Sequence, residues 1–272
     1  MPGEWTLARC RACGGYSQLP LPAPSVVPSF YPPTYSAYGD DPAIGWLFRL
    51  TFWLDARRVA GLIGRQGAVL DVGCGAGAAL AAMAEHGQWQ LHGLELDAEA
   101  VRRAQGRGLK VQQGDLISCD FAPESFDLIR LGHVIEHVLD PPATLRRAFE
   151  LLRPGGLLFG ETPNINCWDF RVFGRYWGAL HFPRHLTFFS ERTLTQALRD
   201  AGFSGVRIVP RLRTVGWSAG IQNWLADRFG MSVPAQGRVS WYVLLILLFL
   251  PVTLAQTLVS RPGTIAFIAR KP

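Results

Sequence analysis

The sequence is short of charge and lacks an even set of cysteines. Charged residues make up 18% of the 272 positions and hydrophobic residues 49%, a balance that excludes an intrinsically disordered polymer. The five cysteines are an odd number, which argues against a secreted domain held by disulfides. The N-terminus has no basic segment followed by an apolar core, so it has no visible secretory signal and we expect a cytoplasmic protein.

A concentrated block of positive charge is also missing. The net charge is +6, but the arginines are scattered along the chain, so we expect no nucleic-acid partner. The excess of positive charge instead gives weak support for contact with an anionic membrane surface.

Alternating patterns in the middle of the chain predict an α/β fold. Helical spacing covers residues 44–63, 76–86, 98–105, 142–152 and 190–201, and strand-like runs cover 68–72, 89–96, 109–113, 126–131, 155–161 and 206–210. The order predicts a doubly wound, mainly parallel sheet with a final strand at the C-terminus, where "TIAFIARKP" begins at residue 264. In such sheets, ligands bind at the carboxyl ends of the strands.

Breaks in this rhythm divide the chain into four parts. Residues 1–40 are rich in Pro, Tyr and Ser and read as an extended segment that wraps the domain. Residues 41–211 are expected to form the main domain and residues 212–261 a hydrophobic helical insert. Residues 262–272 are expected to return as the last strand of the main sheet.

A glycine-rich loop, "VLDVGCGAGAAL" at residues 69–80, is the most specific motif. Gly73, Gly75 and Gly77 lie between a predicted strand and a predicted helix, where the absence of a side chain lets a ligand approach the backbone. A dinucleotide loop would read G-x-G-x-x-G, so the earlier third glycine disfavours a nicotinamide oxidoreductase. Asp71 would repel a phosphate and suits a ligand that carries an ammonium group.

Two further acids follow the next strands. Glu95 ends the second strand, where a carboxylate can accept both hydroxyls of a ribose. Asp115 follows the third strand and is placed to accept from an adenine amino group, with Leu116 beside the ring. These acids indicate a nucleoside ligand that also carries a cation.

These stretches, together with "GLELD", "FDLIRLGHVIEHVLDPPATLRRAFELLRPGG" and "GETPN", resemble class I S-adenosylmethionine-dependent methyltransferases, in the subgroup similar to the ubiquinone-pathway O-methyltransferases. The resemblance covers about residues 30–210. It implies a Rossmann-like, seven-stranded sheet whose last strand is antiparallel, and S-adenosylmethionine as cofactor. It places Asp71, Gly73 and Gly75 near the methionine end, Glu95 at the ribose and Asp115 at the adenine. Gly77, Leu116 and His133 are assigned to the same cofactor site, and a decayed site in the same fold is the alternative.

The pentad "HVIEH", residues 133–137, matches the H-x-x-E-H pattern of some zinc proteases. Those sites need a long helix, whereas Pro141 and Pro142 leave room here for little more than one turn. The resemblance implies that Glu136 and His137 lie where some relatives bind a divalent ion. We predict no metal, and we hold Glu136 and His137 as candidates for catalysis or for packing under a substrate loop.

The aromatic stretch at residues 162–189 is too long to be an ordinary loop, and we assign it to the acceptor. Trp177, His181 and Arg184 are its candidate substrate contacts, and His185 is a candidate catalytic residue. Transfer to oxygen requires the acceptor to lose a proton, which a neutral histidine accepts near pH 7. His137 and His185 are both candidates for this base, and a purely structural cap over the site is the alternative.

Cys10 and Cys13 have the spacing of a zinc knuckle, but a structural zinc site needs four ligands. The resemblance implies a complete four-cysteine ribbon here in many relatives, of which this chain looks as if it keeps only the second half. We therefore predict no zinc unless histidines or a second chain complete the site.

A hydrophobic run without any charge, "SWYVLLILLFLPVTLAQTLV" at residues 240–259, has the length of a membrane span. It lies between two strands expected to pair in one sheet, and a single crossing would put those strands on opposite sides of a membrane. We therefore expect residues 217–259 to form a helical hairpin at the membrane surface, with a bend at Pro251. A dimer contact or a cap over the substrate pocket is the alternative.

Together these observations predict a class I methyltransferase that transfers a methyl group from S-adenosylmethionine to oxygen. The expected acceptor is a small molecule of lipid-linked, quinone-like or glycan type at the membrane surface, and a homodimer is compatible with the sequence. The alternative is a catalytically inactive, cofactor-binding adaptor at the membrane.

Overall fold

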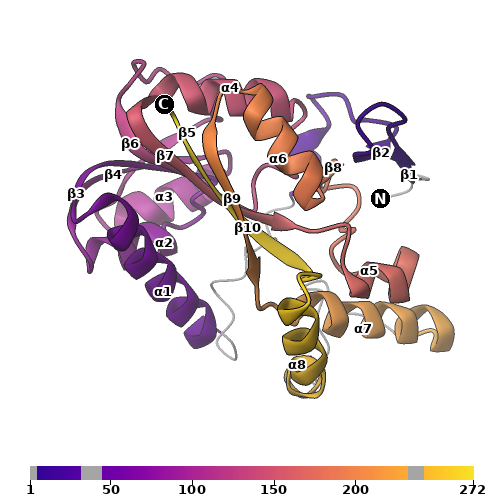
Figure 1. The fold of residues 1–272 in the computed structure, drawn as a ribbon. Coiled ribbons are helices and arrows are strands. Elements are labelled where there is room, and N and C mark those ends of the chain that lie inside the picture. The colour runs from indigo at the N-terminus through magenta and orange to yellow at the C-terminus, as the bar shows by residue number, and fades with distance from the viewer. Residues whose placement is uncertain (1–4, 32–44, 232–241) are drawn as a thin grey trace.

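The computed structural model describes residues 5–31, 45–231 and 242–272 (Figure 1). Its strands are β1 (Thr6–Arg9), β2 (Tyr16–Leu19), β3 (Gln66–Val72), β4 (Gln88–Glu95), β5 (Lys110–Gln113), β6 (Phe126–Gly132), β7 (Leu152–Pro163), β8 (Thr187–Phe188), β9 (Ser204–Arg211) and β10 (Thr264–Arg270). Its helices are α1 (Gly45–Ile63), α2 (Ala78–Ala84), α3 (Ala98–Gly106), α4 (Pro141–Leu151), α5 (Trp168–Phe173), α6 (Glu191–Asp200), α7 (Val215–Phe229) and α8 (Tyr242–Leu258). Short 3-10 turns lie at Val27–Phe30 and Gly174–Tyr176.

The central sheet has seven strands in the order β5-β4-β3-β6-β7-β10-β9. The pairs β5-β4, β4-β3, β3-β6 and β6-β7 are parallel, and β10 runs antiparallel to both β7 and β9. The predicted Rossmann-like sheet with an antiparallel last strand is therefore confirmed. Because the parallel strands all point the same way, the residues that follow β3, β4, β5, β6 and β7 gather at one edge of the sheet.

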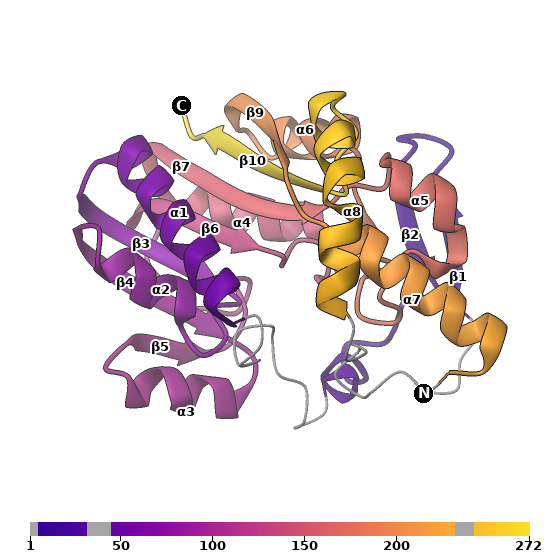
Figure 2. The ribbon, with the colours of Figure 1, turned by 90° about the horizontal axis from the view of Figure 1, so that it is seen from below.

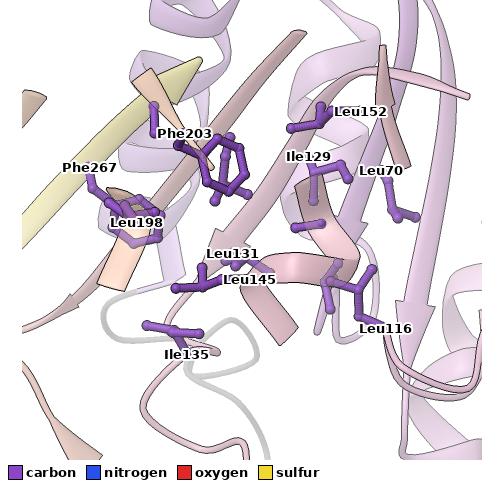
Figure 3. Packing of buried hydrophobic residues seen from close by; sticks show 14 of the residues in the cluster. Leu70, Leu116, Ile129, Leu131, Ile135, Leu145, Leu152, Leu198, Phe203 and Phe267 are labelled. Carbon is purple, nitrogen blue, oxygen red and sulfur yellow. The ribbon is translucent and has the colours of Figure 1, made fainter. Parts of the chain in front are cut away.

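Helices cover both faces of the sheet, which explains the near-continuous apolar runs in β3 and β6. On one face α4 and α6 pack on the strands, with Leu145, Leu198 and Phe203 among the enclosed side chains (Figure 3). On the other face α1 and α2 contribute Val59 and Met83 to a second cluster. Burying this apolar area on both faces is the main stabilising term of the fold.

Side chains fix the beginnings of the covering helices. Asp97 accepts from the backbone N–H of Glu99 at 2.9 Å at the start of α3. Asp140 accepts from the N–H of Ala143 at the start of α4, and Ser190 forms a capping box with Thr193 at the start of α6. These side chains accept from the first N–H groups of each helix, which have no partner within the helix. Each helix therefore begins at a defined residue.

The N-terminal segment contains structure that the sequence pattern did not reveal. β1 and β2 pair as an antiparallel hairpin, and β2 pairs with β8 of the aromatic stretch. The free and exposed Cys10 and Cys13 lie at the turn of this hairpin, where the N–H of Gly15 donates to the Cys13 sulfur at 3.4 Å. The expectation that this half-knuckle holds no zinc stays a prediction.

The predicted hydrophobic insert contains α7 and α8, which lie beside each other in both views (Figures 1 and 2). Trp217 stacks on Phe249 at 5.5 Å between ring centres, and its indole N–H donates to Gln256 at 2.8 Å. Pro251 lies inside α8, which continues past it. In the described ranges, no helix combines the length and apolar character that a membrane crossing requires.

Candidate active site

The glycine loop turns the chain sharply after β3. Gly73, Gly75 and Gly77 all have positive φ angles, of 65°, 56° and 81°. A Cβ on Gly73 would lie 2.7 Å from a methyl group of Val134, and one on Gly77 would collide with Leu109. A Cβ on Gly75 would meet nothing within 4 Å. Two of these glycines thus permit close packing of the protein, while Gly75 leaves a free approach to the backbone.

Glu95, at the end of β4, holds this loop in place. One carboxylate oxygen accepts from the N–H of Gly75 at 2.8 Å, and the other accepts from the N–H of Asp97 at 2.9 Å. Each oxygen of a carboxylate has a second acceptor site, so both can still receive a hydroxyl proton. The side chain is half-buried beside the glycine loop.

After β5, the structure corrects one residue of the predicted adenine site. Asp115 is exposed, and one of its oxygens accepts from the N–H and the hydroxyl of Ser118, so the other oxygen is left for a ligand. Leu116 is only 2% exposed and packs in the core with α4, so it does not lie beside a ring. Leu96 and Ile117, which are 62% and 51% exposed, are the apolar side chains that flank this position. Leu96 directly follows Glu95, and Ile117 directly follows Leu116. Their place beside these predicted contacts is the sequence signal that could have identified them.

Asp71 is fully buried, and its carboxylate forms an ion pair with Arg130 of β6 at 2.8 Å. From the sequence, we expected the ammonium group of a ligand to be the partner of Asp71, and Arg130 was not predicted. Burial raises the pKa of Asp71, and the charge of Arg130 opposes that rise. The second carboxylate oxygen has no hydrogen-bond partner among the described residues. Its assignment to the cofactor site stays a prediction.

His133, directly after β6, lies between two carboxylates, those of Glu136 and Glu161. Its Nδ1 is 3.0 Å from Glu136, and its Nε2 is 3.8 Å from Glu161 of β7. Burial disfavours the charged form of this histidine, but the hydrogen bond to Glu136 and the two negative charges prevail and raise its pKa. Burial likewise disfavours ionised Glu136, yet His133 and His137 lower the pKa of that carboxyl. His133 and Glu136 therefore favour the charged pair.

His137 and His185 face each other edge to face, with ring centres 4.5 Å apart. The Nδ1 of His185 lies 2.7 Å from the carbonyl of Ala179, and the Nδ1 of His137 lies 3.1 Å from the carbonyl of Arg184. Because a carbonyl can only accept, each Nδ1 carries the proton, which leaves a lone pair on each Nε2. Burial lowers the pKa of His137 and holds the pKa of His185 well below its usual value. Both rings are thus neutral near pH 7.

The aromatic stretch supplies the rest of this cluster. His181 accepts at its Nε2 from the Arg184 guanidinium at 3.0 Å, and burial lowers the pKa of His181 to about 4. The N–H groups of Leu186 and Thr187 donate to the carbonyl of Glu136, which fastens the stretch to the residues after β6. His181, Arg184 and His185 are therefore brought together with His137, as one would expect of a single site.

Trp177 is the exception among the predicted acceptor contacts. It is 1% exposed, packs among α5, β8 and their neighbours, and donates its indole N–H to Asp169 at 2.8 Å. The aromatic character that marked it as a ligand contact serves packing in this position. We correct its assignment from the acceptor site to the core.

Glu136, His137 and His185 each offer one ligand atom, and these three atoms lie within 4.8 Å of one another. Their histidine Nδ1 groups bond carbonyls, which is the usual support for a metal-binding imidazole. The set could hold a divalent ion with water completing the coordination. The expectation of no metal remains untested.

Comparison with known families decides the class of this site. A family model described as "Methyltransferase domain" matches residues 46–208, more than half of the chain. The chain belongs to this methyltransferase family. The matched region runs from α1 to β9 and contains the glycine loop, the acids after β4 and β5, and the histidine cluster.

Curated relatives point to the same family. The methyltransferase is 31% identical over 170 residues to the ubiquinone biosynthesis O-methyltransferase of Aromatoleum aromaticum. This match covers 58% of this chain and 70% of the relative. It is 35% identical over 121 residues to the enzyme of the same name from Pseudomonas fluorescens strain Pf-5, and the match covers 42% of this chain. The second match spans half the length of that relative.

Solved structures share the fold at low sequence identity. A Haemonchus contortus phosphoethanolamine N-methyltransferase 2, in complex with phosphomonomethylethanolamine and S-adenosylhomocysteine, superposes with a TM-score of 0.63 at 17% identity. That match covers 94% of this chain and 62% of the other. An S-adenosylmethionine-dependent methyltransferase from Archaeoglobus fulgidus gives a TM-score of 0.55 at 20% identity, over 83% of this chain and 99% of the other.

The class I methyltransferase uses S-adenosylmethionine, and the residues present fit that cofactor. Gly75 leaves its backbone open to a ligand, Glu95 keeps free acceptor sites for hydroxyl groups, and Asp71 has one oxygen without a partner in the described chain. Leu96, directly after β4, and Ile117, after β5, add exposed apolar surface at the same edge of the sheet. These donor and acceptor types match a ribose, an ammonium group and a purine.

Proposed function

We propose that this methyltransferase methylates an oxygen atom of a lipid-linked, quinone-like or glycan-type acceptor at a membrane surface, with His137 as general base. The observation that carries the proposal is the neutral histidine cluster at the carboxyl edge of the sheet. Its members come from the residues after β6 and from the aromatic stretch, next to the glycine loop that follows β3. The names of the curated relatives support transfer to oxygen.

His137 suits the role of base better than His185. His137 is partly exposed, whereas His185 is 7% exposed, so an acceptor has better access to the His137 ring. The pKa of His185 also lies well below the usual value, which makes it a weak base. We assign His185 to orienting the His137 ring through the edge-to-face contact.

When bound, S-adenosylmethionine supplies an electrophilic methyl group on a positively charged sulfur. The Nε2 of His137 takes the proton of the acceptor hydroxyl as that oxygen accepts the methyl group, and the bound cofactor would keep the electrons of the former carbon–sulfur bond as neutral S-adenosylhomocysteine. Glu136, 1% exposed, stabilises the imidazolium that results, because its negative charge raises the pKa of His137. The proton then passes from His137 to solvent, which the partial exposure of the ring allows.

The acceptor class rests on the surface of the insert. On α8 the side chains of Leu244, Leu247, Leu248 and Leu258 are between 61% and 84% exposed, while Leu245 and Gln256 face the protein. A helix with one packed side and one apolar exposed side is typical of a segment that lies in a membrane interface. The net charge of +6 favours anionic lipid at that interface.

The base is tested by His137→Gln, which keeps a polar side chain but removes the imidazole. We expect kcat to fall by about 100-fold, with the affinity for S-adenosylmethionine in calorimetry unchanged. His86→Gln, in the loop after α2 and away from the cluster, is the control and should keep its activity. Turnover of His137→Gln at the wild-type rate would remove the base from the proposal and leave positioning alone to account for catalysis.

The acceptor and the membrane contact need separate assays. Methyl-labelled cofactor incubated with a membrane lipid extract should label a lipid-phase product, and binding without release of S-adenosylhomocysteine would favour the inactive adaptor.

In flotation with phosphatidylglycerol vesicles, we expect the wild type to float and the double variant Leu247→Ser, Leu248→Ser to stay at the bottom. Leu54→Ser, an exposed leucine of α1, is the matched control. A wild type that stays at the bottom would contradict membrane docking.

A further inference from the structure

The N-terminal arm, residues 5–31, lies outside the segment that the family model matches, yet it reaches the histidine cluster. Its strand β2 pairs with β8 directly after the cluster, with Ser17 opposite Thr187. The N–H of Gln18 donates to the carbonyl of Leu186 at 2.9 Å, and the Gln18 side chain is buried. The arm is therefore fixed to the same stretch of chain that supplies His185.

The end of the arm is fixed next to the cluster by three further contacts. Phe30 is 2% exposed and packs edge to face with Trp5 at 6.2 Å between ring centres. The Nε of Arg184 donates to the carbonyl of Phe30 at 2.7 Å, and the Arg184 guanidinium lies 5.8 Å from the ring centre of Tyr31. Tyr31 is thus positioned through the residue before it and by its ring.

The hydroxyl of Tyr31 lies 3.0 Å from the Nδ1 of His137. The same nitrogen lies 3.1 Å from the carbonyl of Arg184, which can only accept. A lone pair on this nitrogen would face the lone pairs of that carbonyl, so the proton belongs on Nδ1. Both the carbonyl and the Tyr31 oxygen then accept from one N–H, and the Nε2 of His137 keeps its lone pair.

We propose that Tyr31 is a positioning residue, which the N-terminal arm supplies to hold the His137 ring in one orientation by accepting from its Nδ1–H beside the Arg184 carbonyl. Nothing in the matched methyltransferase segment provides this contact, because Tyr31 precedes it in the chain. The consequence for catalysis rests on the proposed role of His137 as base. The positioning contact itself does not, since it follows from the geometry around one nitrogen atom.

The decisive measurement is the nitrogen NMR spectrum of the imidazoles, recorded at pH 8 on full-length protein with ¹⁵N-labelled histidine. The signals of His137 are identified by their loss in His137→Gln. In the wild type we expect the shifts of a ring protonated at Nδ1. In Tyr31→Phe, which removes only the hydroxyl, we expect the ring to stay protonated at Nδ1, because the Arg184 carbonyl still accepts, and the Nδ1 signal to shift, because the N–H loses its second acceptor. Tyr16→Phe removes a hydroxyl from the same arm, away from His137, and should leave these signals unchanged.

A kinetic comparison separates this inference from the proposed function. We expect Tyr31→Phe to lower kcat about tenfold without changing the KM for S-adenosylmethionine, and Tyr16→Phe to change neither. Unchanged His137 signals in Tyr31→Phe, or a wild-type ring protonated at Nε2, would overturn the inference whatever the activity. If the signals move while His137→Gln keeps full activity, the positioning of His137 by Tyr31 stands and the assignment of the base fails. If His137→Gln is inactive and Tyr31→Phe is fully active, Tyr31 has no positioning role in the reaction.

Discussion

Gly75 is the glycine of the loop whose missing side chain faces open space, and this distinguishes it from Gly73 and Gly77. Gly75→Ala places a methyl group where the cofactor approaches the backbone, in addition to the cost of a side chain at a φ angle of 56°. We expect S-adenosylmethionine to bind at least tenfold more weakly, measured by calorimetry. Gly108→Ala is the matched control, because Gly108 has a φ angle of 79° and open space outside the site. It should cost stability of about 1 kcal/mol and leave the affinity unchanged, and equal affinities in the two variants would contradict a ligand at Gly75.

Glu95 has two functions that one substitution can separate. Glu95→Gln keeps an oxygen that can accept from Gly75, but it replaces an acceptor by an amide that donates. We expect about tenfold weaker binding of S-adenosylmethionine, which corresponds to about 1.4 kcal/mol, and a slightly lower melting temperature of the free protein, because the exposed N–H of Asp97 exchanges its carboxylate acceptor for water. Glu99→Gln removes an exposed carboxylate four residues along the chain and should bind the cofactor like the wild type. An equal loss in both variants would point to a general effect of charge and not to a contact.

At the scale of elements, buried charges tie together the strands and helices under the site. Arg130 of β6 pairs with Asp71 of β3, and Arg211 of β9 bridges Asp55 of α1 and Glu161 of β7. Arg213, between β9 and α7, also pairs with Glu161, at 3.0 Å. These pairs cross elements that are far apart in the chain, so they fix how the edge of the sheet is assembled.

Arg130→Met tests the cost of breaking one such pair. It leaves the fully buried Asp71 without its countercharge, and we expect the free energy of unfolding to fall by about 3 to 5 kcal/mol in urea titrations. Asp71→Asn in the same chain removes the unpaired charge and should recover at least half of that loss. Arg153→Met breaks an exposed pair with Asp127 and should cost less than about 1 kcal/mol. A loss for Arg130→Met as small as that of Arg153→Met would show that the buried pair does not stabilise the fold.

The sequence was sufficient for the elements of the main sheet but not for contacts between distant residues. Strands such as β3 and β6 are predictable because burial on both faces demands an apolar run, and α6 because Ser190 and Gly202 mark its ends. The β1–β2 hairpin was missed because its two strands have four residues each and too little pattern to detect. The partner of Asp71 was missed because Arg130 is 59 residues away, inside a strand that otherwise reads as apolar. Leu116 and Trp177 were misassigned since residue type alone does not show whether an apolar side chain faces a ligand or the core.

At the scale of the whole molecule, several segments far apart in the sequence meet at the carboxyl edge of the sheet. The glycine loop and the acids after β4 and β5 form the cofactor side, and the residues after β6 form the base. The aromatic stretch packs on α7 through Gly178 and Ala219, and the N-terminal arm closes the cluster through β2 and β8. A cluster built in this way stays neutral only while the chain is folded, so its histidines link folding to pH.

His181 provides the clearest case of this linkage. Its pKa falls to about 4, chiefly through burial and then through the charges of Arg184 and His137, while an unfolded chain binds the proton near pH 6.5. Because the folded pKa is the lower one, the unfolded state gains protons first, and stability is lost as pH falls from about 6.5 towards 4. His181→Gln removes this term and keeps an acceptor for Arg184. Between pH 7 and pH 5, we expect the unfolding free energy of this variant to fall by about 1 kcal/mol less than that of the wild type, after allowance for partial exposure. The contributions of the other titrating groups cancel in the difference between the two proteins. If urea titrations gave both proteins the same pH dependence, His181 would take up its proton as readily in the folded chain as in the unfolded chain, and the prediction would be wrong.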